Sequence, residues 1–284
     1  MQQKRNNILR LTESAIMIAL ATVLSEIQIV NLPFGGTVTA FSMLPVLIIA
    51  YRYGLRWGLF TGGVYGVFQM LLGMGNLKYG TSGVAVAVIV LFDYLIAFGV
   101  LGLGGIFRDR IKNQGLALAG GGLLACALRY LCHCVSGYFV WYIWAWEGYS
   151  PLGYALAYNA TYMVPETILT VAGALLISLI LDFSSTDITR RSRVKTDDRL
   201  ERSNAAVAAK IMGIAIALVG VLRGVVMVIN EFIASAEPDI AKGDVISTIL
   251  TGAVAGVVLY ALGEGVQALC DLRALKAKEN KQES

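Results

Sequence analysis

VAVAVIVLFDYLIAFGVLGLGGIF, residues Val84–Phe107, is the stretch that decides the fold class of this chain. It contains a single charged side chain, Asp93. A helix needs about 20 consecutive apolar residues to cross a hydrocarbon core of about 30 Å. The stretch therefore predicts a membrane-spanning α-helix that carries one carboxyl group within it.

Charged residues make up 15% of the 284 residues, against about 25% in a soluble domain, which also indicates a membrane protein. Similar apolar stretches lie on both sides of Val84–Phe107. The other stretches are Ile8–Val30, Val38–Ala50, Gly58–Gly73, Gly115–Trp141, Leu152–Leu181, Ala205–Ile233 and Val245–Leu269.

From these eight stretches we predict an all-α, polytopic membrane helix bundle with a six-helix core and two extra C-terminal transmembrane helices. The expected domains are 1–182 (a six-helix membrane domain, to which the binding residues discussed below belong), 183–203 (a charged cytoplasmic linker) and 204–284 (a two-helix membrane hairpin whose role the sequence does not define).

The basic residues indicate the orientation. If all eight stretches cross the membrane, one side holds Lys4, Arg5, Arg10, Arg52, Arg56, Arg108, Arg110, Lys112, Arg190, Arg191, Arg193, Lys195, Arg199, Arg202, Arg273, Lys276, Lys278 and Lys281. The opposite loops hold Lys78 and Lys242. Because loops rich in Lys and Arg stay in the cytoplasm, we expect a multi-pass membrane protein with both termini cytoplasmic. The net charge of +4 then reflects topology, and it gives no basic groove for nucleic acid.

Several classes of chemistry lack their motifs. The sequence has no G-x-x-x-x-G-K-[ST] motif for ATP, and His133 is its single histidine. Cys132, His133 and Cys134 are consecutive, so on a helix they point about 100° apart and cannot converge on one metal ion. We therefore expect no metal, no cofactor and no enzymatic activity, and any uphill transport must draw on an ion gradient or on a partner protein.

Ionisable groups within a bilayer are costly and indicate a functional site. His133 lies roughly 12 Å and Asp93 about 14 Å below the outer ends of their helices, at 1.5 Å per residue, so the two can share a level. Arg129, His133, Gly137 and Trp141 follow at steps of four and lie on one helix face. Glycine at 137 leaves space for a flat ring, and the acid, imidazole and indole suit an aromatic cation.

Two polar groups are expected deeper in the membrane. Arg129 and Glu166 lie about 20 Å from the outer ends of their helices, and a buried arginine without a carboxylate is heavily penalised. We predict that they form a structural ion pair, with ligand contact as the alternative. The aromatic residues Tyr142, Trp144, Trp146 and Tyr149 are expected to be interfacial belt or loop residues.

Four stretches carry a family resemblance: FSMLPVLIIAYRYGLRWGLFTG (Phe41–Gly62), LFDYLIAFGVLGLGGIF (Leu91–Phe107), RYLCHCVSGYFVW (Arg129–Trp141) and PLGYALAYNATYMVPE (Pro151–Glu166). In this order they resemble the thiamine-specific S-component, the substrate-binding subunit, of energy-coupling-factor (ECF) transporters. The resemblance implies a six-helix subunit that binds thiamine from outside and has no ATPase activity. It also implies partners and a location: an ECF transmembrane T-component and two ATPase subunits, which use the ATP, and the lipid of the bacterial cytoplasmic membrane.

The resemblance also implies particular residues. The expected substrate-binding set is Asp93, Tyr94, His133, Gly137, Trp141, Tyr154, Asn159 and Tyr79. Some family members have Glu in place of Asp93, and Tyr79 is chosen for a binding tyrosine in a loop whose length differs here. Ala15 and Ala19 form an A-x-x-x-A pair on the first helix, which the resemblance assigns to docking on the partner; small residues at this spacing let membrane helices approach closely.

Other functions remain open on the sequence alone. The same architecture could bind a thiamine precursor or another vitamin. A membrane-embedded enzyme using Asp93 and His133 as acid and base, and an ion-coupled carrier working alone, are weaker alternatives, since there is no second carboxylate at that level and no inverted repeat of the kind such carriers show.

Overall fold

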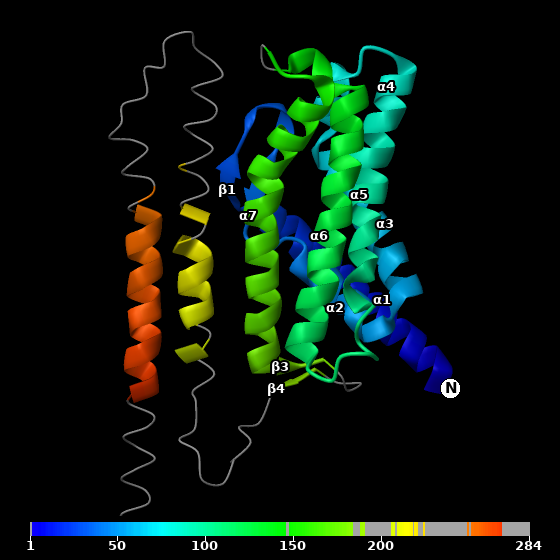
Figure 1. Cartoon of the computed structure of the whole chain (residues 1–284). Coiled ribbons are helices and arrows are strands. Elements are labelled where there is room, and N and C mark those ends of the chain that lie inside the picture. Colours follow the sequence, from blue (N-terminus) through cyan, green and yellow to red (C-terminus); the bar gives the residue numbers. More distant parts are fainter. Residues whose placement is uncertain are drawn as a thin grey trace, which may run out of the picture. The chain divides into compact units, whose positions relative to one another are not determined.

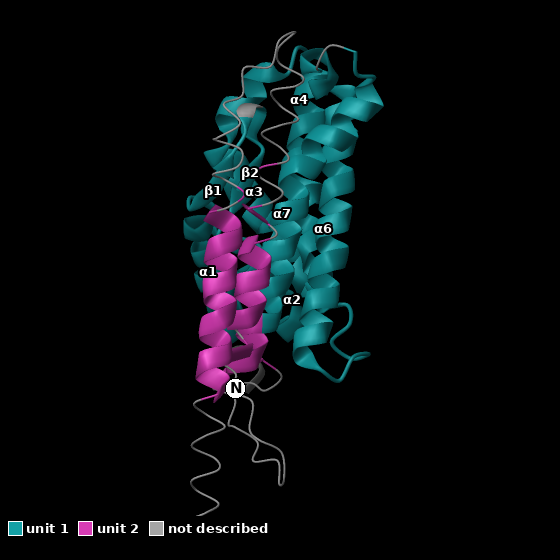
Figure 2. Ribbon diagram, turned by 60° about the vertical axis from the view of Figure 1, so that its left-hand side comes forward, with its two compact units in different colours: residues 1–175, 232–238 teal, residues 176–231, 239–284 magenta. Residues whose placement is uncertain are grey.

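The fold is seen in a computed structural model that describes residues 2–145, 148–183, 188–190, 206–207, 209–217, 219–220, 224, 249 and 251–268 (Figure 1). The chain divides into two compact units, which Figure 2 shows in different colours. The first comprises Met1–Leu175 and Phe232–Pro238, and the second comprises Leu176–Glu231 and Asp239–Ser284. All the residues expected to bind substrate lie in the first unit.

Helices dominate the first unit, as the apolar stretches predicted. Its α-helices of ten or more residues are α1 (Gln2–Ser25), α2 (Leu44–Tyr53), α3 (Leu55–Leu72), α6 (Gln114–Phe139) and α7 (Pro151–Ile180), the last of which continues into the second unit. Among the described residues, four helical stretches are long and apolar enough to cross a membrane: Asn6–Ser25, Gly83–Gly105, Gln114–Phe139 and Pro151–Ile180. The chain is thus a multi-pass membrane protein.

The stretch that opened the sequence analysis forms one helical rod with changes of pitch. It runs through α4 (Gly83–Val88), the π-helical η3 (Ile89–Leu95), α5 (Ile96–Gly99) and the 3-10 helix η4 (Val100–Gly105). Glycines bring this rod close to its neighbours: a Cβ atom on Gly62 of α3 would lie 2.5 Å from the carbonyl oxygen of Phe98. Such contacts between small residues are how membrane helices pack closely.

The first two apolar stretches differ from the prediction. Helix α1 ends at Ser25, and the chain then forms an antiparallel hairpin of β1 (Gln28–Asn31) and β2 (Thr37–Thr39), joined through the short 3-10 helix η1 (Pro33–Gly35). The Pro-Phe-Gly-Gly turn closes the hairpin, because Phe34 and Gly35 adopt φ angles of 65° and 90°, which suit a tight turn and not an α-helix. Helix α2 consequently has 10 residues, about 15 Å, which is too short to cross the membrane alone.

The second unit contains the short strands β3 (Leu181–Asp182) and β4 (Thr189–Arg190), which pair with each other, and helical residues at 209–217 and 251–268. Glycines bring these two helical segments together, since a Cβ on Gly213 would lie 2.5 Å from the carbonyl oxygen of Gly256. A Cβ on Gly220, which is also helical, would lie 2.5 Å from the Cα of Gly252. Glu264 forms an ion pair with Lys210 at 2.6 Å. The domain boundaries at 182 and 203 stay a prediction.

Candidate functional site

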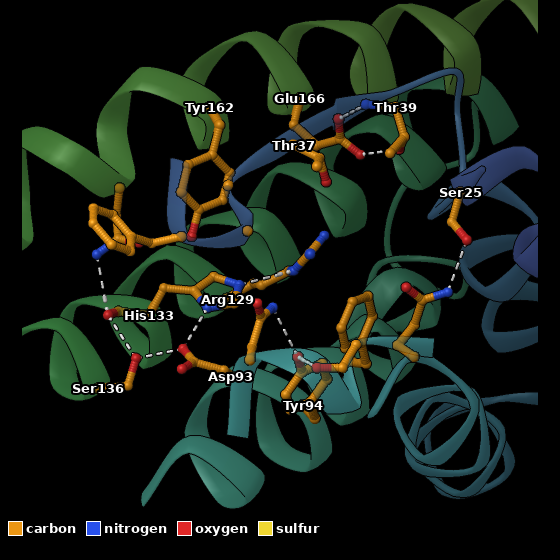
Figure 3. A pocket seen from close by; sticks show the side chains of 18 of the residues that line it. Ser25, Thr37, Thr39, Asp93, Tyr94, Arg129, His133, Ser136, Tyr162 and Glu166 are labelled. Carbon is orange, nitrogen blue, oxygen red and sulfur yellow. Dashed lines mark hydrogen bonds and ion pairs between the residues drawn. The ribbon is translucent and has the colours of Figure 1, made fainter. Parts of the chain in front are cut away.

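A cavity of about 310 Å³ lies within the first unit (Figure 3). Residues of the hairpin, α3, η3, α6 and α7 line it, so it collects side chains from most of the chain up to residue 166. Its volume falls at the lower end of the range for small-molecule sites, about 300–1,000 Å³. The cavity can therefore hold one compact ligand.

Asp93 is the centre of the polar network in this cavity. Its Oδ1 atom lies 2.9 Å from His133 Nδ1 and also accepts a hydrogen bond from the Ser136 hydroxyl, and its Oδ2 accepts one from Trp141 Nε1 at 3.0 Å. The prediction that an acid, an imidazole and an indole meet at one depth thus agrees with this geometry. The three donors fix the carboxylate in an orientation that leaves it on the cavity wall.

The π-helical turn explains how Asp93 reaches this position. A π turn places an extra residue in one helical turn and often occurs at functional sites. Here η3 spans Ile89–Leu95 and includes both Asp93 and Tyr94. Tyr94 is turned toward α3, where its hydroxyl donates to the Gly73 carbonyl oxygen at 3.0 Å and accepts from Asn76 Nδ2 at 3.3 Å. Tyr94 therefore anchors the rod beside Asp93 while also lining the cavity.

Asn159 joins α6 to α7. Its Nδ2 donates to the carbonyl oxygens of His133 (3.1 Å) and Ala155 (2.8 Å), and its Oδ1 accepts from the Tyr162 hydroxyl at 2.6 Å. Its amide is therefore engaged within the protein, and its contribution to the cavity is to fix the α6 backbone at His133. Tyr154, on the same helix, is buried and lines the cavity.

The space beside Gly137 is used differently from the prediction. A Cβ atom at this position would lie 2.9 Å from the Ala155 Cβ and 3.1 Å from the Asn159 Nδ2. The glycine therefore lets α6 and α7 approach each other, and the room that was expected for a ligand ring is filled by α7. Gly137 still lines the cavity through its backbone.

An aromatic cluster borders the same cavity. Trp141 lies at ring-centroid distances of 5.5 Å from Tyr79 and 6.3 Å from Phe34, and Phe34 stacks on Trp144 at 5.5 Å. Tyr79 packs against Trp141 and Phe34 without being one of the cavity-lining residues. Trp144, expected at the interface or in loop packing, contacts the hairpin tip, so the cluster ties the hairpin to the loops that follow α3 and α6.

Arg129 and Glu166, both in the described part of the chain, line the cavity but do not form the predicted ion pair. Glu166 accepts hydrogen bonds from the Thr39 backbone N–H at 2.6 Å and from the Thr39 hydroxyl at 2.7 Å. Arg129 donates from Nε to His133 Nε2 at 3.2 Å and from Nη1 to Met43 Sδ at 3.0 Å. The prediction was wrong because estimated depth gives the height of a side chain and not its direction around the helix.

Ala15 and Ala19 lie on the exposed side of α1, whereas Ser14 and Ile18 on the same helix are buried. The predicted docking pair is thus available on the surface of this chain. The docking role of this pair stays a prediction.

Sequence reasoning missed three contributors to the site. Ser136 follows His133 by three residues and so shares its helix face, which was a usable signal. Phe34 sits in a Pro-Phe-Gly-Gly turn typical of a loop, and Thr39 ends the hairpin. The strands on either side of that turn were not expected, because most of their residues fall inside the apolar stretches Ile8–Val30 and Val38–Ala50, which predict helices.

Comparison with known proteins decides the family. The sequence profile of the family described as Thiamine transporter protein (Thia_YuaJ) matches residues 11–186. The chain belongs to this thiamine transporter family. All the residues expected to bind substrate fall inside the matched range, and the two C-terminal helical segments fall outside it.

Individual members of the thiamine transporter family agree with this assignment. Thiamine transporter ThiT of Bacillus subtilis (strain 168) is 32% identical over 173 residues, which cover 57% of this chain and 86% of the relative. Thiamine transporter ThiT of Lacticaseibacillus paracasei is 26% identical over 186 residues, covering 60% and 86%. The solved structure of ThiT from Listeria monocytogenes has the same fold over 61% of this chain and 93% of its own, with a TM-score of 0.50 and 22% identity.

Proposed function

We propose that this chain is the thiamine-binding subunit of an ECF-type importer, with thiamine in the cavity around Asp93 and with separate T-component and ATPase subunits supplying the energy. The observation that carries the proposal is the carboxylate of Asp93, which His133, Ser136 and Trp141 hold on the wall of a cavity bordered by aromatic rings. Membership of the thiamine transporter family supports it.

The charge of the cavity fits a cationic ligand. The lining includes three carboxylic side chains, Glu26, Asp93 and Glu166, and one guanidinium, Arg129. Thiamine combines an aminopyrimidine ring with a positively charged thiazolium ring. Aromatic faces such as that of Trp141 attract such a cation, and a carboxylate accepts hydrogen bonds from ring amino groups. The excess of acidic groups would oppose an added phosphate.

Two features support the proposed partner subunits: the sequence lacks an ATP-binding motif, and α1 exposes small residues. Since the sequence lacks a P-loop, accumulation of thiamine against a gradient needs another source of energy. The exposed Ala15 and Ala19 of α1 offer a small-residue face on which the T-component would dock. In this arrangement both termini are cytoplasmic, in line with the distribution of basic residues.

Calorimetric titration of the detergent-solubilised chain with thiamine tests the binding function. We expect tight binding by the unaltered chain and a loss of about 10- to 150-fold in Asp93→Asn, because a hydrogen bond to a charged group contributes about 1.5–3 kcal/mol. Asp109→Asn is the matched control, since Asp109 is exposed in the loop before α6. A preference for free pyrimidine, thiazole or flavin compounds over thiamine would assign the site to another vitamin or to a precursor, and equal losses in both variants would remove Asp93 from the site.

Uptake into vesicles tests the partnership. We expect thiamine accumulation only when the T-component and the ATPase subunits are present together with ATP. Loss of uptake in Ala15→Leu with unchanged thiamine binding would support the docking face. Accumulation by this chain alone would contradict the proposal and favour an ion-coupled carrier.

A further inference from the structure

We infer that Arg129 is a positioning residue that holds His133 as the neutral tautomer with its proton on Nδ1. The two side chains lie one helical turn apart on α6, and Arg129 Nε is 3.2 Å from His133 Nε2. A guanidinium has donors and no acceptor. Nε2 must therefore present its lone pair to Arg129, so the ring proton resides on the other nitrogen.

The other side of the ring agrees with this assignment. His133 Nδ1 lies 2.9 Å from Asp93 Oδ1, and a carboxylate accepts a proton donor at that distance. The three groups form a directed chain in which Arg129 donates to His133 and His133 donates to Asp93 (Figure 3). Both ring nitrogens are committed, and the residue is 7% exposed.

Arg129 is itself held in place, which lets it act on the ring. Its Nη1 donates to Met43 Sδ at 3.0 Å, and its guanidinium carbon lies 4.2 Å from the centre of the Phe98 ring. Glu166 does not compete for it, because that carboxylate bonds to Thr39. The guanidinium is thereby oriented by a sulfur atom and an aromatic face, and its Nε–H remains aimed at the imidazole.

Asp93 favours a proton on Nδ1, and Arg129 is the group that the structure places at Nε2, where it opposes a second proton. Among the described residues, Asp93 faces it from η3, and Tyr162 faces it from α7 with a ring-centroid distance of 5.8 Å and with its hydroxyl donated to Asn159. The remaining titratable groups that line the cavity are Glu26, Tyr94, Tyr154, Tyr158 and Glu166. Protonating Nε2 would break the bond from Arg129 and place a second positive charge beside the guanidinium.

The consequence concerns ligand binding and rests on the proposed function. With a neutral imidazole, the Asp93 carboxylate keeps its negative charge uncompensated by His133 and can attract the cationic ring of thiamine. A protonated imidazole would cancel that charge. Arg129 therefore makes thiamine affinity insensitive to pH in the range where a free imidazole titrates, around its usual pKa of about 6.5.

Nitrogen-15 NMR of histidine-labelled protein tests the tautomer directly, because His133 is the single histidine of the chain and a purification tag without histidine keeps it so. For the unaltered chain we expect a protonated Nδ1 and an unprotonated Nε2 from pH 8 to pH 5.5. In Arg129→Met we expect the ring to titrate or to change tautomer in that range. Arg56→Met, which removes an exposed arginine of α3, is the matched control and should leave the spectrum unchanged.

A proton on Nε2 in the unaltered chain, titration of its ring between pH 5.5 and 8, or an unchanged spectrum in Arg129→Met would each overturn the inference. If Arg129→Met does not fold, Arg129→Leu replaces it in the same titration, and the spectrum of the unaltered chain still tests the tautomer. Thiamine titration separates this result from the proposed function. We expect less than a threefold change in affinity between pH 8 and 5.5 for the unaltered chain and about a tenfold loss for Arg129→Met, because at pH 5.5 about nine in ten free imidazoles are protonated. An Nδ1–H ring without thiamine binding would refute the proposed function and leave the tautomer assignment intact.

Discussion

Glu166 fastens the hairpin to α7, and its replacement by glutamine gives a measurable prediction. The side chain is 3% exposed, and its two oxygens accept the backbone N–H and the hydroxyl of Thr39 at 2.6 and 2.7 Å. Glu166→Gln preserves the shape but removes the charge. A hydrogen bond to a charged acceptor contributes about 1.5–3 kcal/mol and one between neutral groups about 0.5–1.5 kcal/mol, so each bond weakens by about 1 kcal/mol.

The summed change of about 2 kcal/mol corresponds to about a 30-fold rise in the population of an opened hairpin. Hydrogen exchange measured by mass spectrometry on peptides covering residues 26–43 should show this acceleration at the Thr39 amide, while peptides from α3 keep their rates. Thr167→Val is the matched control, because the neighbouring Thr167 hydroxyl bonds to the Met163 carbonyl oxygen within α7.

Equal exchange rates in Glu166→Gln and the unaltered chain would refute the role given to this carboxylate. So would an acceleration of the same size in Thr167→Val, since it would indicate a general loosening of α7. Combining Glu166→Gln with Thr39→Val should give less than the sum of the two separate effects, because the residues share a bond.

Three further substitutions test the packing and the site. Trp141→Phe keeps an aromatic ring but removes the N–H bonded to Asp93, an intramolecular hydrogen bond that contributes about 1.5–3 kcal/mol to the fold. Because the carboxylate is then less well oriented, thiamine affinity measured by calorimetry should fall; an unchanged affinity would show that this bond does not position Asp93 for the ligand. Gly137→Val must push α7 away from α6 and should destabilise the protein by about 1–3 kcal/mol, seen as a lower thermal midpoint in detergent. Gly220→Leu should disturb the contact with Gly252, lowering protection from exchange at residues 251–268 without altering thiamine affinity; a loss of affinity would mean that these segments contribute to binding.

The long helices were predictable because length and hydrophobicity are local properties. The stretch Gly115–Trp141 corresponds to α6 (Gln114–Phe139), and Leu152–Leu181 corresponds to α7 (Pro151–Ile180). Axial rise alone placed Asp93 and His133 at one level, and the structure joins them at 2.9 Å.

The rest of the site depended on information that a single helix does not contain. Arg129 turns toward His133 one turn along its own helix, and Glu166 turns toward Thr39 of a hairpin that the apolar pattern concealed. Gly137 was interpreted as open space because nothing in the sequence shows how closely α7 approaches. Direction around a helix and distance between helices are set by packing, and packing is settled by the whole bundle.

The π-helical turn at Ile89–Leu95 has a consequence for how this transporter tolerates change. Successive residues of an α-helix are rotated by about 100°, so the direction of Asp93 depends on how many residues precede it in the turn as well as on what they are. Removing one residue from Ile89–Leu91 would convert the turn to regular α-helix and swing the carboxylate away from His133, although every side chain of the site remained in the sequence. The number of residues in this turn is therefore as important for function as Asp93 itself. An insertion or deletion there would abolish function, whereas most single substitutions there would not.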